Sequence, residues 1–199
     1  METTKFILRN IERSYEIYQA LVNFEENIFG AVDQALRHNC QKWLPDQWTI
    51  NDEYSLAEEW CLDIIREELK KDDEPNASYI SIGLAVEGDD PIWKFFGVDA
   101  DNRDSVYTYL TMVELPGSEY ETIIPELDSL LKEPLFRLGF QRKGGKSEPY
   151  YKKELSFSNL AVYKGLEEDD WEEALRPVVK ALMALDKLDW HRIISIFKK

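Results

Sequence analysis

The sequence predicts an α+β fold in which a mostly antiparallel sheet is flanked by helices, built as one domain over residues 1–199. Apolar and small residues alternate along 79–114, which is the two-residue period of strands. Long stretches on either side show the three- and four-residue spacing of helices. The connections between strands are too short for parallel crossovers, which need a dozen or more residues. With 199 residues, 44% of them hydrophobic, the chain is long enough to bury its own core.

The first predicted helix covers residues 12–43 and ends before Pro45. Its apolar positions are separated by three, four and seven residues, so they share one face. The intervening Asp33 and Arg37 are predicted to face water. The apolar positions are Tyr15, Tyr18, Val22, Phe29, Val32, Leu36, Cys40 and Trp43.

A second helix is predicted over residues 55–71, opened by the capping box Ser55-Leu56-Ala57-Glu58. In such a box the serine side chain binds a backbone amide of the first turn. Leu56, Trp60 and Ile64 would form the buried face, and the opposite face would be acidic.

Three strands follow, at Tyr79–Val86, Ile92–Val98 and Val106–Glu114. The segment Glu87-Gly88-Asp89-Asp90-Pro91 is a turn, because glycine tolerates positive φ and proline cannot donate to a ladder. A polar loop, 99–105, joins the second strand to the third. The sequence therefore predicts a three-strand meander over 79–114.

The remaining elements are a third helix at 119–138, further strands near 140–163 and a fourth helix at 167–188. Two of the strands surround the turn Gly144-Gly145, and Phe157–Tyr163 is a candidate for one more. The end of the chain, 190–197, is apolar and fits either a short edge strand or a helical turn.

Charge is the strongest functional signal, because 24 basic residues oppose 39 acidic ones and the net charge is −15. Such a charge disfavours direct binding to nucleic acid, which needs clustered lysine and arginine. Between Asp46 and Glu74 there are 11 acidic and 3 basic residues, an excess of eight negative charges. One interpretation is a solvated helix face, and the other is a surface that attracts a basic protein. On the second interpretation the partner-binding residues are Glu53, Glu58, Glu59, Asp63, Glu67, Asp72 and Asp73.

The charge reverses between Lys132 and Lys153, where seven basic residues oppose two acidic ones. Gly145-Lys146-Ser147 is similar to the end of a phosphate-binding loop, but Phe140 stands where that motif needs glycine. Glu148-Pro149 follows where the motif needs a helix. A plain hairpin turn is the prediction for this segment.

The order of elements from Ser55 to Leu155 is a helix, three strands, a helix and a strand. This order resembles the core of the PD-(D/E)XK nuclease superfamily. The resemblance implies metal-dependent phosphodiester cleavage, with Asp99 or Asp101 as the first acid. The motif itself is absent: Glu114-Leu115-Pro116 lacks the lysine, and the only Glu-x-Lys is Glu68-Leu69-Lys70, ahead of the strands.

Other chemistries have little support. His38 and His191 are the only histidines and lie in no catalytic or metal motif. Cys40 and Cys61 fit reduced core thiols better than a disulfide framework. No cofactor, metal site or catalytic residue is predicted. Without a signal segment or a long apolar run, we expect a cytoplasmic protein that does not bind membranes.

Three functional hypotheses follow. The leading one is a non-enzymatic acidic protein that neutralises a basic partner, as an immunity protein covers a toxin or a DNA mimic blocks a nucleic-acid enzyme. The second is an active or degenerate phosphodiesterase in which Lys143, Lys146, Lys152 and Lys153 contact phosphate. The third is a scaffold protein with an ordinary acidic surface. The oligomeric state is left open by the sequence.

Overall fold

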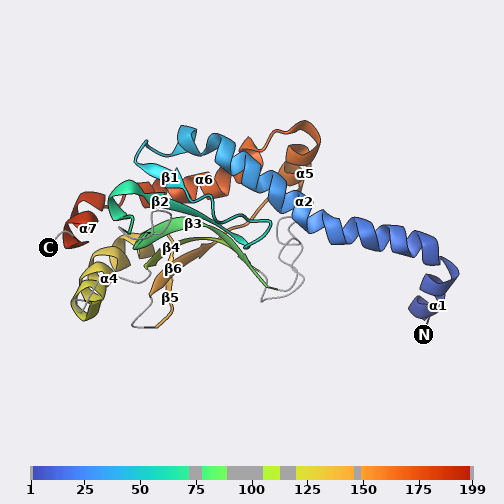
Figure 1. Ribbon diagram of the computed structural model, residues 1–199, viewed down its shortest axis with the longest axis horizontal. Coiled ribbons are helices and arrows are strands. Elements are labelled where there is room, and N and C mark those ends of the chain that lie inside the picture. The colour runs from blue at the N-terminus through green and yellow to red at the C-terminus, as the bar shows by residue number, and fades with distance from the viewer. Residues whose placement is uncertain (1, 72–77, 89–104, 113–119, 146–148, 198–199) are drawn as a thin grey trace.

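A computed structural model describes residues 2–71, 78–88, 105–112, 120–145 and 149–197. Its centre is one six-stranded sheet in the order β1-β2-β3-β4-β6-β5, flanked by helices (Figure 1), which confirms the predicted α+β class. Every pairing between neighbouring strands is antiparallel. The strands are β1 Trp48–Ile50, β2 Cys61–Arg66, β3 Ile80–Glu87, β4 Ser105–Met112, β5 Gln141–Lys143 and β6 Tyr150–Glu154.

The first and third strands of the predicted meander are confirmed as β3 and β4. They pair directly along their whole length, from Ile80 opposite Met112 to Glu87 opposite Ser105. The prediction that 92–98 lies between them is therefore wrong in its strand order, because β2 and β4 are the two neighbours of β3. Residues 92–98 themselves lie outside the described part of the chain.

The predicted helix at 55–71 is wrong. The capping box does form one turn, in which the Ser55 hydroxyl accepts a hydrogen bond from the Glu58 amide at 3.1 Å. Trp60 then adopts a left-handed φ of 63°, and the chain continues as β2 and the short 3₁₀ helix η1, Glu67–Leu69. Both edges of β2 are paired, with β1 and with β3. Pairing in the sheet thus outweighs the local helical preference.

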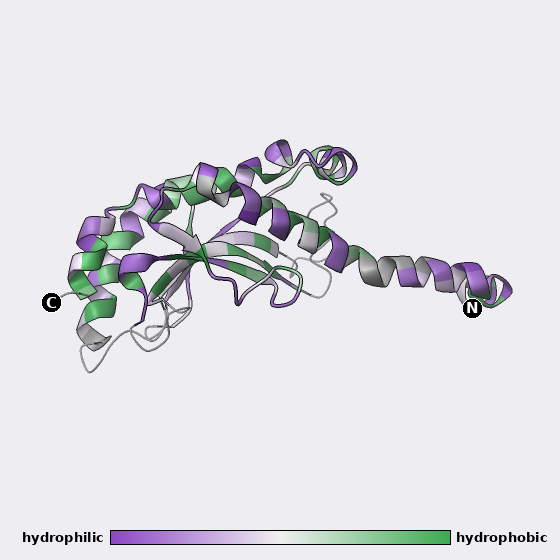
Figure 2. Cartoon of the chain, turned by 45° about the horizontal axis from the view of Figure 1, so that its top comes forward, coloured by the Kyte–Doolittle hydropathy of each residue, from purple (hydrophilic) through white to green (hydrophobic). Residues whose placement is uncertain are grey.

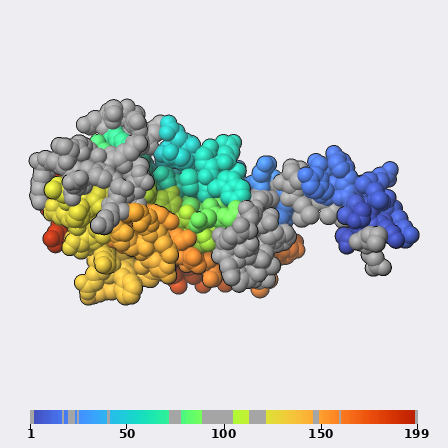
Figure 3. Space-filling model, turned by 90° about the horizontal axis from the view of Figure 1, so that it is seen from below, coloured from blue at the N-terminus to red at the C-terminus, as the bar shows by residue number. Residues whose placement is uncertain are grey.

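The N-terminal helix is confirmed as α2, Ile11–Trp43, and it follows an additional helix α1, Glu2–Arg9. The predicted third helix is confirmed as α4, Tyr120–Arg137. Together α1 and the first part of α2 project from the body as an arm (Figures 1 and 3). We define the arm as residues 2–23, because residues 3–19 are mostly exposed, whereas α2 is in contact with the core from Phe24 onward.

The end of the chain is more helical than predicted. Phe157–Tyr163 is not a strand, because α5, Asn159–Glu168, begins there behind the cap residue Ser158. The predicted helix at 167–188 corresponds to α6, Glu172–Asp186, which starts later because Asp169 adopts a left-handed φ of 55° and ends α5. The segment after it is the helix α7, Trp190–Phe197, which decides between the two predicted alternatives.

The main core lies between one face of the sheet and the helices above it. Figure 1 shows α2 and α6 on that face, with α4 and α7 near one end of the sheet. Ile82 and Leu110 from the sheet, Val32 from α2 and Val178 from α6 are all fully buried. Each such side chain contributes roughly 1.5–3 kcal/mol by leaving water. Hydrophobic and hydrophilic residues alternate along the surface helices (Figure 2), as expected for helices that cover a core.

Candidate interaction surfaces

The predicted acidic binding residues do not form one helix face. Glu53, Glu58 and Glu59 are exposed in the loop before β2, whereas Glu67 is exposed in η1 after it. The six residues of β2 separate the two groups, and a strand of that length spans about 20 Å. Asp72 and Asp73 lie outside the described residues. The described residues of 53–73 therefore do not form a continuous acidic face.

Asp63 occupies a different environment from the other predicted acids. It lies in the middle of β2 opposite Gly83, and the Tyr109 hydroxyl donates a hydrogen bond to its carboxylate. Burial raises the pKa of Asp63 to about 6, and a hydrogen bond from Ser81 partly offsets that rise. The side chain is therefore held within the sheet rather than presented to a partner.

Gly83 makes the contact between Asp63 and Tyr109 possible. A β-carbon at position 83 would lie 2.1 Å from the Leu62 carbonyl oxygen and 2.6 Å from the Tyr109 hydroxyl. The tyrosine ring thus occupies the space that any larger residue would fill.

Next to the Tyr109 ring, the Lys152 ammonium lies 4.8 Å from the centre of the Tyr107 ring and 3.2 Å from the Glu87 carboxylate. Figure 3 views the molecule from the side of the sheet opposite α2 and α6.

Asp33 and Arg37 of α2 connect this helix to the loop before β2. Asp33, predicted to face water, is buried and accepts hydrogen bonds from the Leu56 amide at 3.1 Å and from Arg37 Nε at 2.5 Å. Arg37 also donates to the Asp52 carboxylate at 2.8 Å and to the Tyr54 carbonyl. The prediction that Asp33 faces water is wrong because the loop folds over this side of the helix.

The basic stretch 132–153 does not form a free cationic patch among its described residues. Arg142 is paired with Asp128 at 2.8 Å, and Arg137 is paired with Glu133. Lys152 and Lys153 are neighbours on β6, so they point to opposite faces of the sheet. Lys153 donates to the Leu138 carbonyl at 2.8 Å, and its ammonium lies 5.9 Å from the centre of the Phe140 ring. Lys143 is exposed, and Lys146 lies outside the described residues.

The nuclease resemblance receives no added support here and stays a prediction. Asp99, Asp101 and Glu114 lie outside the described residues. Glu68 is paired with Arg66, and Lys70 with Glu67, so the Glu-x-Lys segment forms local ion pairs around η1. Within the described residues, no three His, Cys, Asp or Glu side chains are arranged to hold a metal ion.

The remaining sequence candidates are placed as follows. His38 is exposed on α2 and His191 is exposed on α7. Cys61 is a free thiol whose pKa is raised to about 11, mainly by burial and further by Asp63 and Glu59. The side chain of Cys40 lies outside the described part. None of the helices in the described ranges combines the length and the apolar content that crossing a membrane requires.

The sequence analysis missed a surface at the junction of α5 and α6, which we call the α5–α6 corner. Three large apolar side chains of α5 are exposed: Leu160 by 74%, Tyr163 by 53% and Leu166 by 40%. Six acidic residues with one buried tryptophan among them follow within seven positions: Glu167, Glu168, Asp169, Asp170, Glu172 and Glu173. The sequence analysis placed Leu160 and Tyr163 in the candidate strand Phe157–Tyr163 and the acids in the predicted helix at 167–188, so it did not bring the two groups together.

The corner is sharply bent because Trp171 packs under α5. Its ring would come within 2.8 Å of a β-carbon at position 165, so only glycine allows this approach. Trp171 itself is buried. Because Asp169 ends α5 and Trp171 fixes the start of α6, the acidic residues lie around the end of the helix that carries the apolar ones.

Lys164 is the only base between Leu160 and Leu175, so this stretch has a net charge of minus five, six acids less one lysine. Its ammonium lies 2.5 Å from the Asp170 carboxylate and 4.0 Å from Glu168. The hydrogen bond and the charge of Lys164 hold the pKa of Asp170 below its usual value. One lysine cannot neutralise six carboxylates, so the corner keeps a strongly negative potential. This potential lies beside Leu160, Tyr163 and Leu166, which we call the apolar ridge.

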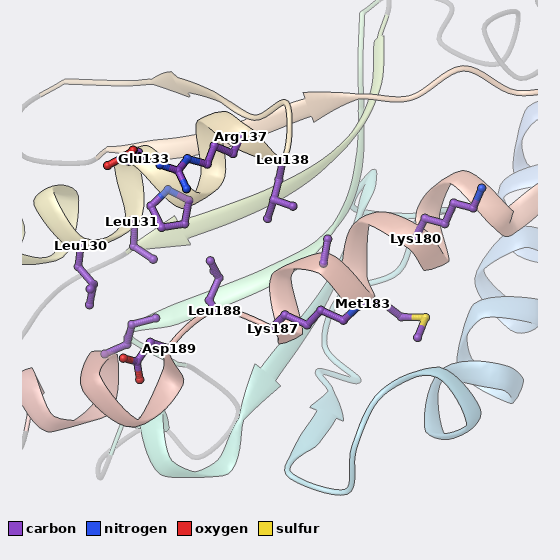
Figure 4. A pocket seen from close by; sticks show the side chains of 13 residues that line it. Leu130, Leu131, Glu133, Arg137, Leu138, Lys180, Met183, Lys187, Leu188 and Asp189 are labelled. Atoms are coloured by element: carbon purple, nitrogen blue, oxygen red, sulfur yellow. Dashed lines mark hydrogen bonds and ion pairs between the residues drawn. The ribbon is translucent and has the colours of Figure 1, made fainter.

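A separate groove of about 640 Å³ lies between α4, α6 and α7 (Figure 4). Leu131, Leu138 and Leu188 extend into the space between the helices, and Met183 lies on α6 at one side of it. The Arg137–Glu133 pair lies along its rim. Its lining is mostly apolar, so it provides packing surface rather than converging catalytic groups.

Comparison with known proteins gives no match: no family model, no curated protein and no solved structure is similar to this chain.

Proposed function

We propose that this chain is a non-enzymatic acidic protein that binds a basic, amphipathic segment of another protein at the α5–α6 corner. The observation that supports the proposal is the combination of an exposed apolar ridge with six carboxylates beside it. Leu160 and Tyr163 are exposed by 74% and 53%, and burying these apolar side chains against a partner would stabilise a complex. This proposal moves the binding surface from residues 53–73 to residues 160–173.

In this proposal the acids and the apolar ridge act on different quantities. The acids raise the association rate of the partner, and the apolar ridge stabilises the bound complex. Clustered charge raises the association rate of an oppositely charged partner, because the potential acts before contact. Exposed surface charges contribute little to affinity once they are screened, so affinity depends on the buried apolar contacts. A protein of this kind would act by covering a basic surface, as immunity proteins and DNA mimics do.

The test measures the association rate of the full chain with a lysine-rich amphipathic helical peptide, over a range of salt concentrations. Replacing Glu167, Glu172 and Glu173 with glutamine removes three charges from the corner without changing side-chain size. We expect the association rate to fall severalfold at low salt and to converge with the wild type at high salt.

The matched control replaces Glu53, Glu58 and Glu59 with glutamine, which removes the same charge from the loop before β2. This variant should keep nearly the wild-type rate. Equal losses in the two variants would contradict a specific corner site, because they would mean that only the net charge matters. A Leu160→Ser, Tyr163→Ser variant should instead raise the dissociation rate.

A further inference from the structure

The apolar stripe of α2 continues beyond the body of the protein. Phe29, Val32 and Leu36 are exposed by 2%, 0% and 3%, whereas Ile11, Tyr15 and Tyr18 on the same stripe are exposed by 57%, 62% and 60%. The positions 11, 15 and 18 follow the alternation of four- and three-residue steps that is typical of helix pairs. The arm therefore has a helix face suited to packing and nothing in its own described chain that covers it.

The tip of the arm adds more apolar surface and a line of positive charge. Phe6 and Leu8 are exposed by 65% and 68% on α1. Lys5, Arg9 and Arg13 follow one another at intervals of four residues and are all exposed. Asn10, at the junction of α1 and α2, donates its side-chain amide to the Phe6 carbonyl at 2.9 Å, which keeps the two helices closely connected.

The charges of the arm set it apart from the rest of the chain. Residues 2–23 contain three basic residues (Lys5, Arg9 and Arg13) and three acidic ones (Glu2, Glu12 and Glu16), so their net charge is zero. The whole net charge of −15 is thus carried by the residues beyond the arm. Two bodies of this charge repel each other, and an arrangement that places them at opposite ends of a paired arm keeps that repulsion small.

The position of α5 matches such an arrangement. In both Figure 1 and Figure 2, α5 lies beside the part of α2 where the helix leaves the body. From Ile11 to Phe24 the helix rises by about 20 Å, at roughly 1.5 Å per residue. If two arms lie antiparallel, the basic tip of each one comes to the base of the other, next to the partner's acidic corner.

We infer that a second copy of this chain binds the arm, so that two arms pair antiparallel and each basic tip docks on the partner's α5–α6 corner. This inference rests on the proposed function, since it names one occupant of the same corner. The tip offers what that corner requires: Phe6 for the apolar ridge, with Arg9 on the same side of α1, and Lys5 and Arg13 as further bases for the carboxylates. A parallel pair would place like charges together at both ends.

The first experiment determines the mass of the full chain in solution by light scattering and sedimentation equilibrium. We expect a dimer, and we expect a Tyr15→Ser, Tyr18→Ser variant to raise the dimer dissociation constant at least tenfold. Phe136, exposed by 76% on α4, provides a matched control, because Phe136→Ser removes an equally exposed aromatic away from the arm. A monomeric wild type, or equal weakening by Phe136→Ser, overturns the inference.

The second experiment exchanges the charges. One variant carries Lys5→Glu, Arg9→Glu and Arg13→Glu, and the other carries Glu167→Lys, Glu172→Lys and Glu173→Lys. Each variant alone should be monomeric, because both of its tip-to-corner contacts join like charges. Mixed together, they should form a heterodimer, because every contact then joins opposite charges.

Failure of the mixture to dimerise, or dimers of either variant alone, overturns the docking of tip on corner. These outcomes are distinct from failure of the proposed function. A chain that is monomeric but binds the lysine-rich peptide at the corner keeps the function and loses the inference. The Lys5→Glu, Arg9→Glu, Arg13→Glu variant leaves the corner free of a partner's tip, so failure of that monomeric variant to bind the peptide loses the function as stated.

Discussion

The two halves of α2 carry one continuous apolar stripe, but the stripe is buried in one half and exposed to solvent in the other. The half from Ile28 to Leu36 is buried against the sheet and forms part of the core, whereas the half from Ile11 to Tyr18 extends into solvent. Nothing in the spacing of the residues distinguishes them, since both follow steps of three and four. Helical periodicity therefore tells which residues share a face, but the distance to the sheet decides whether that face is covered.

The same distinction separates the two acidic regions. In the loop that holds Glu58 and Glu59, the aromatic neighbours Tyr54 and Trp60 are exposed by 38% and 36%, whereas Leu160 and Tyr163 beside the acids of the α5–α6 corner are exposed by 74% and 53%. A charge count along the sequence ranks the two regions alike. The second region combines charge with the more exposed apolar side chains, and for that reason we propose the binding surface there.

The largest expected effect contrasts the two halves of α2 directly. Phe29→Ala should lower the free energy of unfolding by about 3–5 kcal/mol, because it leaves a cavity in the core. Tyr15→Ala should change it by no more than about 0.5 kcal/mol, measured by urea denaturation at a concentration where the chain is monomeric. Similar losses at both positions would mean that the first half of the stripe is covered within one chain.

A pair of glycines gives the next contrast. Gly83→Ala should cost about 3 kcal/mol, since the new methyl group meets the Leu62 carbonyl and the Tyr109 hydroxyl. Gly30→Ala should instead stabilise the protein by roughly 0.5–1 kcal/mol, because no atom lies within 4 Å of the new β-carbon and alanine favours the helix. Thermal unfolding of the two variants measures the difference. A destabilised Gly30→Ala would show that α2 bends at this position.

The next prediction concerns Asp63, whose pKa is set by its burial within the sheet. Its pKa is raised in the folded protein from 3.8 to about 6, so the folded state disfavours the ionised form. Its contribution to stability is complete below about pH 4 and is lost as the pH rises through 6.

We therefore expect Asp63→Asn to stabilise the protein by about 3 kcal/mol at pH 7 and by little at pH 4. Denaturation curves of wild type and variant at several pH values give this difference. A difference that does not change between pH 4 and 7 would rule out a raised pKa. Tyr109→Phe serves as a control for loss of the hydrogen bond alone.

The smallest effect concerns two ion pairs with the same spacing of four residues. Arg37→Met should cost about 1.5 kcal/mol, because it leaves the buried Asp33 without its charged partner. Arg137→Met should cost less than about 0.5 kcal/mol, because both side chains of the pair with Glu133 are largely exposed on α4. Chemical denaturation of both variants provides the comparison. Equal costs would indicate that Asp33 reaches water when Arg37 is absent.

Much of the fold was predictable from local patterns. The alternation of apolar residues predicted β3 and β4, and the glycine pair predicted the β5–β6 hairpin. The helical spacing of apolar residues predicted α2 and α4. The failures lie where long-range pairing competes with local preference. Ser55 does cap a helical turn, but Cys61–Arg66 pairs with a strand on each side and buries Leu62, Ile64 and Ile65 in the sheet.

The sequence by itself determined the fold class, the acidic character and the set of residues that share each helix face, because these depend on composition and on short-range geometry. Tertiary structure alone decided which faces are covered. It buried Asp33 under a loop, placed Asp63 beside Tyr109, left Tyr15 in solvent, and set the acids of the α5–α6 corner around an exposed ridge. Burial depends on which segments come close in space, and local patterns along the chain do not reveal those long-range neighbours.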